Sequence, residues 1–133
     1  SWSLPKIGGI SSALELTYSG RIIDASEALK LNLVSSIHDS ENLLDNAIDF
    51  TKNMVKNSAP VSIAVTRQML WRSLEGSGPY DAHIVESKAI DSRGASEDAK
   101  EGVSSFLEKR AAEFKNKVSS DMPEFFPWWK DTN

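Results

Sequence analysis

Apolar residues recur at intervals of three and four along most of the chain, which is the spacing of amphipathic helices. From Leu44 to Val55 they fall on one side, where they are expected to face a core, and charged or amide side chains fall on the other. After a short helical start at Ser3, interrupted by Gly8-Gly9, the pattern predicts helices over about 10–19, 24–32, 41–57, 60–74, 80–92 and 96–110. No segment shows the alternation typical of a strand. The expected fold class is all-α, with five to six helices joined by short connections.

Residues 17–34 carry unusually clear signals for where helices begin and end. Gly20 follows an amphipathic run and suits the left-handed position that closes a helix. Asp24 can cap a second helix, with Glu27 three residues later as in a capping box. Asn32, which tolerates positive φ, stands where that short helix should end. Local chemistry therefore predicts the structure of this stretch, although it indicates no function.

Composition excludes several classes of protein. The chain has 133 residues, with 40% apolar and 26% charged side chains, which is ordinary for one domain with a core. It has no cysteine, so disulfides and thiolate chemistry are excluded. A net charge of -4 argues against a protein that coats nucleic acid, and no apolar run approaches the ~20 residues that span a bilayer. We expect a cytoplasmic protein, with an organelle matrix left open, and the start at Ser1 suggests a processed chain or a fragment.

Residues that could carry a reaction are few. The chain contains no phosphate-loop, zinc-protease or nucleophile-elbow motif. His38 stands beside Asp39 in a polar loop, where a catalytic pair is conceivable but an ordinary exposed histidine is much more common; the same holds for His83 on a helix. Glu97 and Asp98 begin a helix, where its dipole accounts for them. The sequence therefore predicts no catalytic residue and no metal site.

Basic residues gather in the last helix and just beyond it. An anionic ligand such as a phosphate would be attracted to them, but glutamates are interleaved. A solvated helix face with ion pairs is the more common explanation of such a pattern. The set comprises Lys100, Lys109, Arg110, Lys115 and Lys117, interleaved with Glu101, Glu108 and Glu113.

The chain ends in an aromatic and proline-rich tail, residues 118–133, which we separate from a helical region at 1–117. Phe125 to Trp129 include four aromatic residues, split by Pro127, so they cannot form an ordinary helix. Left exposed, they would form a costly apolar patch. They are expected to lie against a surface of the same subunit or of a neighbour. A peptide-like ligand motif is the alternative.

Several short sequence words occur in a fixed order along the chain. They are SLPKIG at 3–8, ALEL at 13–16, SGR at 19–21, ASEA at 25–28, LV at 33–34, SEDAKEG at 96–102 and FLEKR at 106–110. In this order and spacing, residues 3–114 resemble the C-terminal half of the crotonase family, the enoyl-CoA hydratases and isomerases. The resemblance implies that the chain corresponds to the helical region that follows the family's ββα spiral core.

The resemblance also implies a reaction for the parent protein. Crotonase-like enzymes bind an acyl-CoA thioester and stabilise an enolate-like oxyanion with two backbone N–H groups. Those groups, and the acidic residues that move protons, belong to the N-terminal half of the family, so no catalytic residue is carried over. Coenzyme A enters as part of the substrate, and no separate cofactor is expected. The implied activity is lyase or isomerase chemistry on acyl-CoA in fatty acid metabolism.

Two residues of the FLEKR word match positions that can approach CoA in the family. Phe106 and Lys109 would lie near the adenine or phosphate end of CoA bound at a neighbouring subunit. The alternatives are that Phe106 is a core residue and that Lys109 is only a cation at a helix end. Ile90 stands where the family often has an aromatic contact to CoA, and Asn32 stands where it commonly has glycine.

The expected role of the chain by itself is assembly and covering of acyl-CoA, without catalysis. Helices that normally cover a core need new partners, so self-association through residues 10–33 and the last helix is predicted; the parent would be a trimer or hexamer. The alternative is a helical oligomerisation or protein-interaction module with no ligand. Neither nucleic acid nor a membrane is expected as a partner.

Overall fold

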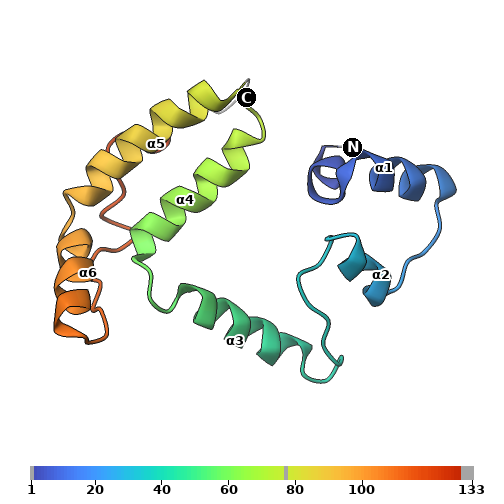
Figure 1. Cartoon of the computed structure of the whole chain (residues 1–133), viewed down its shortest axis with the longest axis horizontal. Coiled ribbons are helices and arrows are strands. Elements are labelled where there is room, and N and C mark those ends of the chain that lie inside the picture. The colour runs from blue at the N-terminus through green and yellow to red at the C-terminus, as the bar shows by residue number, and fades with distance from the viewer. Residues whose placement is uncertain (1, 77, 130–133) are drawn as a thin grey trace. The chain divides into compact units, whose positions relative to one another are not determined.

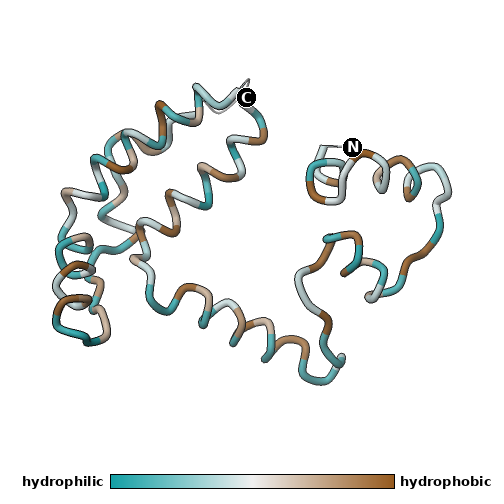
Figure 2. Tube along the Cα trace, viewed as in Figure 1, coloured by the Kyte–Doolittle hydropathy of each residue, from teal (hydrophilic) through white to brown (hydrophobic). Residues whose placement is uncertain are grey.

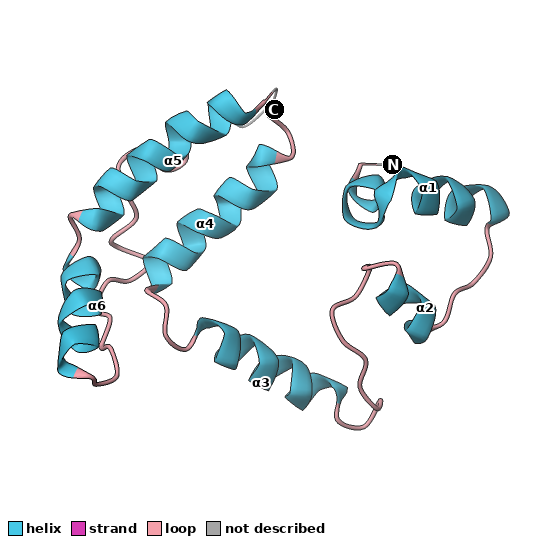
Figure 3. Ribbon diagram, in the orientation of Figure 1, coloured by secondary structure: helices cyan, strands magenta, loops and turns pink. Residues whose placement is uncertain are grey.

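The structure, a computed structural model, describes residues 2–76 and 78–129 and contains six helices (Figure 1). These are α1 (Ser3–Ser19), α2 (Ala25–Lys30), α3 (Leu43–Val55), α4 (Pro60–Ser73), α5 (Pro79–Gly94) and α6 (Glu97–Glu108). Turns and loops make up the rest of the described residues, which include no strand (Figure 3). The all-α prediction is therefore confirmed. The chain divides into two compact units, residues 1–49 and 50–133.

The first unit follows the local signals of residues 17–34. Gly9 has φ 80° and interrupts α1, and Gly20 closes it with φ 61°. The Asp24 carboxylate accepts a hydrogen bond of 2.7 Å from the Glu27 N–H, which caps α2. Asn32 follows with φ 57°. Each predicted beginning and end is confirmed, because the deciding interactions lie within a few residues of one another.

The hydrogen bonds of Arg21 and the close packing at Gly8 connect the segments of the first unit. The Arg21 guanidinium donates to Glu15 at 2.7 Å and to both carboxylate oxygens of Glu27. These bonds hold the pKa of Glu27 below its usual range. At Gly8, an added Cβ would lie 3.1 Å from the Leu33 side chain, so glycine permits the close approach of α1 to the segment after α2.

The helix α3 differs from its expected role. Its apolar and polar positions alternate at helical spacing, as the hydropathy colours along the chain show (Figure 2). Every residue of α3 is nevertheless exposed, with Leu44 72% and Met54 64% accessible. The prediction that its apolar side faces a core is therefore wrong for this chain. Helical periodicity predicts which residues share a face, but burial requires a partner surface.

The core of the second unit lies between α4 and α5. Val61 and Val65 of α4 are essentially inaccessible, and Ala89 of α5 packs with them. Met69, Met122 and Phe125 cover this cluster. Two of these three residues come from the C-terminal tail, so the tail shares a core with residues of α4 and α5 that lie more than thirty positions earlier in the chain.

After α6 the chain returns along the helices as an extended segment rather than a helix. The buried Asp98 carboxylate accepts hydrogen bonds from the N–H groups of Lys115 at 2.8 Å and Asn116 at 3.1 Å. Glu101 accepts another from the Glu113 N–H at 2.7 Å. We call residues 109–117 the return segment.

None of the described helices is long and apolar enough to cross a membrane.

Candidate functional site

The end of α6 holds the two residues that the sequence singled out. Ser96 caps the start of α6, because its hydroxyl accepts a hydrogen bond of 3.2 Å from the Ala99 N–H. It ends at Lys109, which has φ 54° and so adopts the left-handed conformation that closes a helix. The Arg110 N–H then donates to the Ser105 carbonyl at 3.0 Å and completes the turn. Phe106 and Lys109 therefore lie one turn apart at the same helix end.

Both residues are exposed. Phe106 is 81% accessible, and its neighbour Leu107 is 72% accessible. Phe106 is thus not a core residue of this chain, contrary to one of the alternatives from the sequence. Within residues 2–76 and 78–129, Lys109 forms no ion pair. An exposed aromatic ring and an exposed cation therefore lie one turn apart at this surface.

Arg110 has a different role from Lys109. Its guanidinium donates to the two oxygens of Glu101 at 2.5 and 2.9 Å and to Glu108 at 2.6 Å. The bonds from Arg110 to Glu101, with the one from the Glu113 N–H, lower the pKa of Glu101 to about 2. The bonds to Glu101 and Glu108 also raise the pKa of Arg110. Arg110 therefore fastens the return segment to α6, and its charge is already matched by carboxylates.

Some of the basic residues in and after α6 form ion pairs with the glutamates interleaved among them. Lys100 pairs with Glu97 at 2.6 Å on the exposed face of α6. This pair and the Arg110 pairs agree with a solvated helix face. Lys109, Lys115 and Lys117 form no ion pair within the part of the chain that the structure describes. The cations left for an anion are thus the ones at the helix end and beyond it.

Asp98 is a structural residue that sequence reasoning missed. The helix dipole explains an acidic residue in a first turn, but Asp98 is 3% exposed and binds backbone groups seventeen and eighteen residues later. No local signal indicates such a partner, because the return segment has no regular structure.

The remaining candidate residues are His38, His83 and Ile90. The His38 Nε2 lies 2.9 Å from the Ser36 hydroxyl, and this contact is exposed. His83 is exposed on α5, as is Ile90, which is 74% accessible. Among the described residues, no group of three or more His, Asp or Glu side chains could hold a metal ion.

Comparison with known proteins identifies the family. Residues 1–117 match the model of the enoyl-CoA hydratase/isomerase family. The chain therefore belongs to the enoyl-CoA hydratase/isomerase family, and the resemblance inferred from the sequence words is confirmed. The match covers all six helices and the return segment, and it ends before the aromatic tail.

Individual relatives agree with this assignment. The chain is 36% identical over 114 residues to a probable enoyl-CoA hydratase of Bacillus subtilis, covering 84% of this chain and 43% of that protein. It is 32% identical over 125 residues to an enoyl-CoA hydratase of Alternaria alternata, covering 93% and 42%. A probable enoyl-CoA hydratase/isomerase from Mycobacterium abscessus has a similar structure, with a TM-score of 0.79 and 26% identity over 87% of this chain and 45% of that one. The chain spans less than half the length of these relatives.

Proposed function

We propose that this chain is the C-terminal helical part of an acyl-CoA hydratase or isomerase, in which it helps to cover the CoA part of the substrate and builds subunit contacts. Family membership and the names of its relatives support an acyl-CoA substrate. The chain itself is proposed to carry no catalytic group. Protonation steps and the stabilisation of an enolate-like oxyanion would be the work of other parts of the parent protein.

The observation that carries this proposal is the pairing of an exposed aromatic ring with an unpaired cation at the end of α6. The nucleotide of CoA has an aromatic base and several phosphate charges. An exposed Phe106 ring can stack on a base, and the Lys109 ammonium can reach a phosphate on its flexible stem. Arg110 is held by Glu101 and Glu108 and is therefore less suited to this contact.

The first experiment tests whether the chain is catalytically silent. Crotonyl-CoA is added to the purified 133-residue chain, and loss of its conjugated double bond is followed by ultraviolet absorbance. We expect no rate above that of buffer, because the groups that stabilise the oxyanion and move protons are proposed to lie in other parts of the parent protein. A rate comparable to that of a full-length family enzyme would overturn this part of the proposal.

The second experiment tests the nucleotide contact directly by titrating the chain with CoA. We expect weak binding that decreases with salt, since it depends on phosphate charge. Lys109→Ala should weaken it by about fivefold, equivalent to about 1 kcal/mol for one exposed charge-assisted contact. Lys52→Ala, an exposed lysine of α3, removes the same charge elsewhere and serves as the matched control. Absence of binding at millimolar CoA, or equal losses in both variants, would contradict the proposal.

A second candidate is an assembly module with no ligand, favoured by the apolar surface of α6. Val103, Phe106 and Leu107 are each more than 60% exposed, and in the first unit Ile10 and Ile22 are 63% and 96% exposed. Such surfaces favour self-association. Light scattering should therefore show oligomers whose fraction rises with concentration and falls in Leu107→Glu. A strictly monomeric chain at high concentration would count against assembly.

A further inference from the structure

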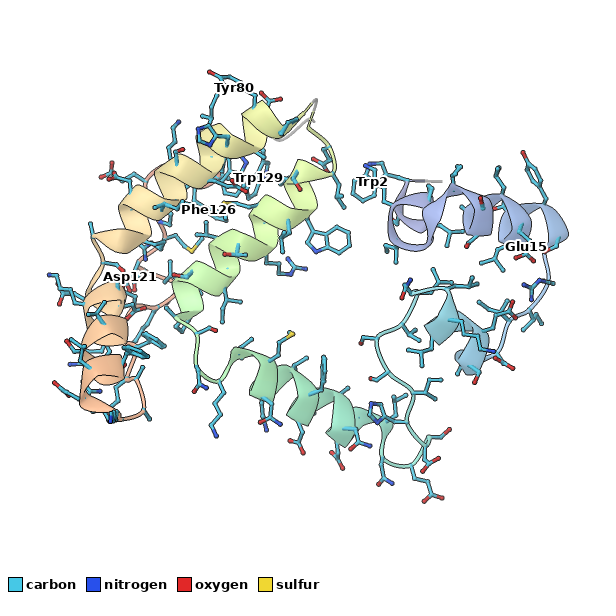
Figure 4. The ribbon with its side chains drawn as sticks, in the orientation of Figure 1. Trp2, Glu15, Tyr80, Asp121, Phe126 and Trp129 are labelled. Carbon is cyan, nitrogen blue, oxygen red and sulfur yellow. The ribbon has the colours of Figure 1, made fainter. Side chains whose placement is uncertain are left out.

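A hollow in the second unit lies away from the end of α6. It has a volume of about 360 Å³, within the range of small-molecule sites. Its apolar lining comes from three elements: Met69 and Leu70 of α4, Ala82 and Val85 of α5, and Trp128 and Trp129 of the tail. We call this hollow the tryptophan pocket. The labelled side chains of Trp129 and Phe126 lie along α4 and α5 (Figure 4).

Aromatic contacts hold the tail wall of the tryptophan pocket in place. The Trp128 and Trp129 rings meet edge to face, with centroids 5.0 Å apart and planes at 86°. Phe126 meets Trp129 in the same way at 5.1 Å and 90°. Phe125, the residue before Phe126, packs on the core cluster of Val61 and Val65. The wall is therefore formed without a ligand, which lowers the entropy cost of binding one.

The charge of the lining is strongly one-sided. Among the described residues, the pocket is lined by three carboxylates, those of Glu75, Asp81 and Glu86, and by one cation, Arg72. Arg72 and Glu75 are already paired, since the Arg72 Nη1 lies 3.1 Å from the Glu75 carboxylate, and the guanidinium stacks 4.4 Å from the centroid of Trp129. Glu86 forms no ion pair in the described part of the chain. The potential inside the pocket therefore favours a positive charge.

We propose that the tryptophan pocket binds a small organic cation, an ammonium group joined to an apolar body. The apolar body would replace water on the methionine, leucine and valine side chains. The ammonium group would lie against an indole face, which attracts cations more strongly than any other side-chain ring. The contact between Arg72 and Trp129 shows that a cation already lies on such a ring here.

This inference is independent of the CoA proposal, because the two surfaces have opposite charge. Within the described residues, the end of α6 presents Lys109 without an ion pair, whereas the lining of the pocket includes the Glu86 carboxylate without an ion pair and an arginine that is paired with Glu75. Phosphate groups would be repelled from the pocket. Loss of CoA binding in a Lys109 variant would therefore leave cation binding unchanged.

The test uses benzyltrimethylammonium as the probe and the complete chain as the receptor. Binding is followed by the indole N–H resonances of Trp128 and Trp129 in NMR spectra. We expect saturable shifts at millimolar probe, and benzoate, a similar ring with the opposite charge, should bind at least about tenfold more weakly. No saturable shift up to about 10 mM probe, a very weak affinity limit, would overturn the proposal. Equal binding of benzoate would overturn it as well.

Matched variants assign the charge preference to the pocket. Glu86→Gln removes one lining carboxylate, and this residue is exposed and forms no ion pair in the described part of the chain, so the fold should be retained. It should weaken probe binding by about threefold. Glu124→Gln changes the net charge equally but at a tail residue that does not line the pocket, and it should leave binding unchanged. Equal losses in the two variants would show only a general charge effect and would refute the site.

Discussion

The two compact units differ in how far apart along the chain their contacting residues lie. In the first unit, the contacts of Arg21 and Asp24 join residues three to six positions apart. In the second, Asp98 and Glu101 bind groups nine to eighteen positions away, and the tail covers a core more than thirty residues upstream. Local hydrogen bonds set the helix ends of the first unit, in which the approach of Gly8 to Leu33 is a longer-range contact. In the second unit, distant parts of the chain must meet before these contacts can stabilise it.

The largest expected effect comes from removing the Asp98 carboxylate. Asp98→Ala takes away the acceptor of two backbone N–H groups and leaves both donors unmatched. Each hydrogen bond to a charged group contributes about 1.5–3 kcal/mol, so a loss of about 3 kcal/mol in the free energy of unfolding is expected. Urea unfolding of the complete chain gives this value, and amide exchange at Lys115 and Asn116 should accelerate.

Asp91→Ala provides the control for that change. Asp91 is an exposed carboxylate near the end of α5, and its replacement should change stability by no more than about 0.5 kcal/mol. If Asp98→Ala were equally mild, the return segment would not depend on this carboxylate, and the contrast between the units would be lost.

A smaller effect is expected at the cap of α2. Asp24→Ala removes the acceptor of the Glu27 N–H and should cost about 1 kcal/mol, in the usual range for a helix cap. Because the interaction is local, the chemical shifts of residues 25–30 should move toward coil values while those of α4 and α5 stay unchanged. Asp39→Ala, in an exposed loop, should alter neither region. Widespread shifts in α4 and α5 would contradict the local character of this unit.

The smallest effect concerns pH and the Glu101–Arg110 contact. The pKa of Glu101 is lowered from 4.5 to about 2 by Arg110 and the Glu113 N–H, so the folded form favours the carboxylate. Its stabilisation is complete above about pH 4.5 and is lost as the pH falls toward 2. Amide exchange at Glu113 should therefore rise over this interval, and Glu101→Gln should remove the Glu101 titration. A Glu101 carboxyl that titrates near 4.5 in NMR spectra would contradict the contact.

Much of the fold could be predicted from the sequence, for reasons that differ among the elements. Gly20, Asp24 and Asn32 act through their own backbone preferences or through neighbours, so their roles are readable without a fold. The amphipathic pattern of α3 also predicts a helix correctly. It does not predict burial, since all of α3 is exposed and no spacing rule supplies a partner surface.

The candidate site was predictable only in part. The family resemblance pointed to Phe106 and Lys109, and the structure places both at the exposed end of α6, while their contact with CoA stays a prediction. Nothing in the sequence indicates that, among the described residues, Arg110 is paired with carboxylates and Lys109 is not. The distinction arises because Glu101 and Glu108 lie within reach of one guanidinium after the chain turns.

By itself, the sequence determined the helices, their ends, the family and the need of the aromatic tail for a surface. Each of these depends on backbone preferences, short-range periodicity or word order, which need no three-dimensional partner. The tertiary structure alone decided that the tail packs on α4 and α5 of its own chain, that Asp98 holds the return segment, and that Trp128 and Trp129 line one pocket with carboxylates. These pairings join residues far apart in the chain, and only packing brings such residues together.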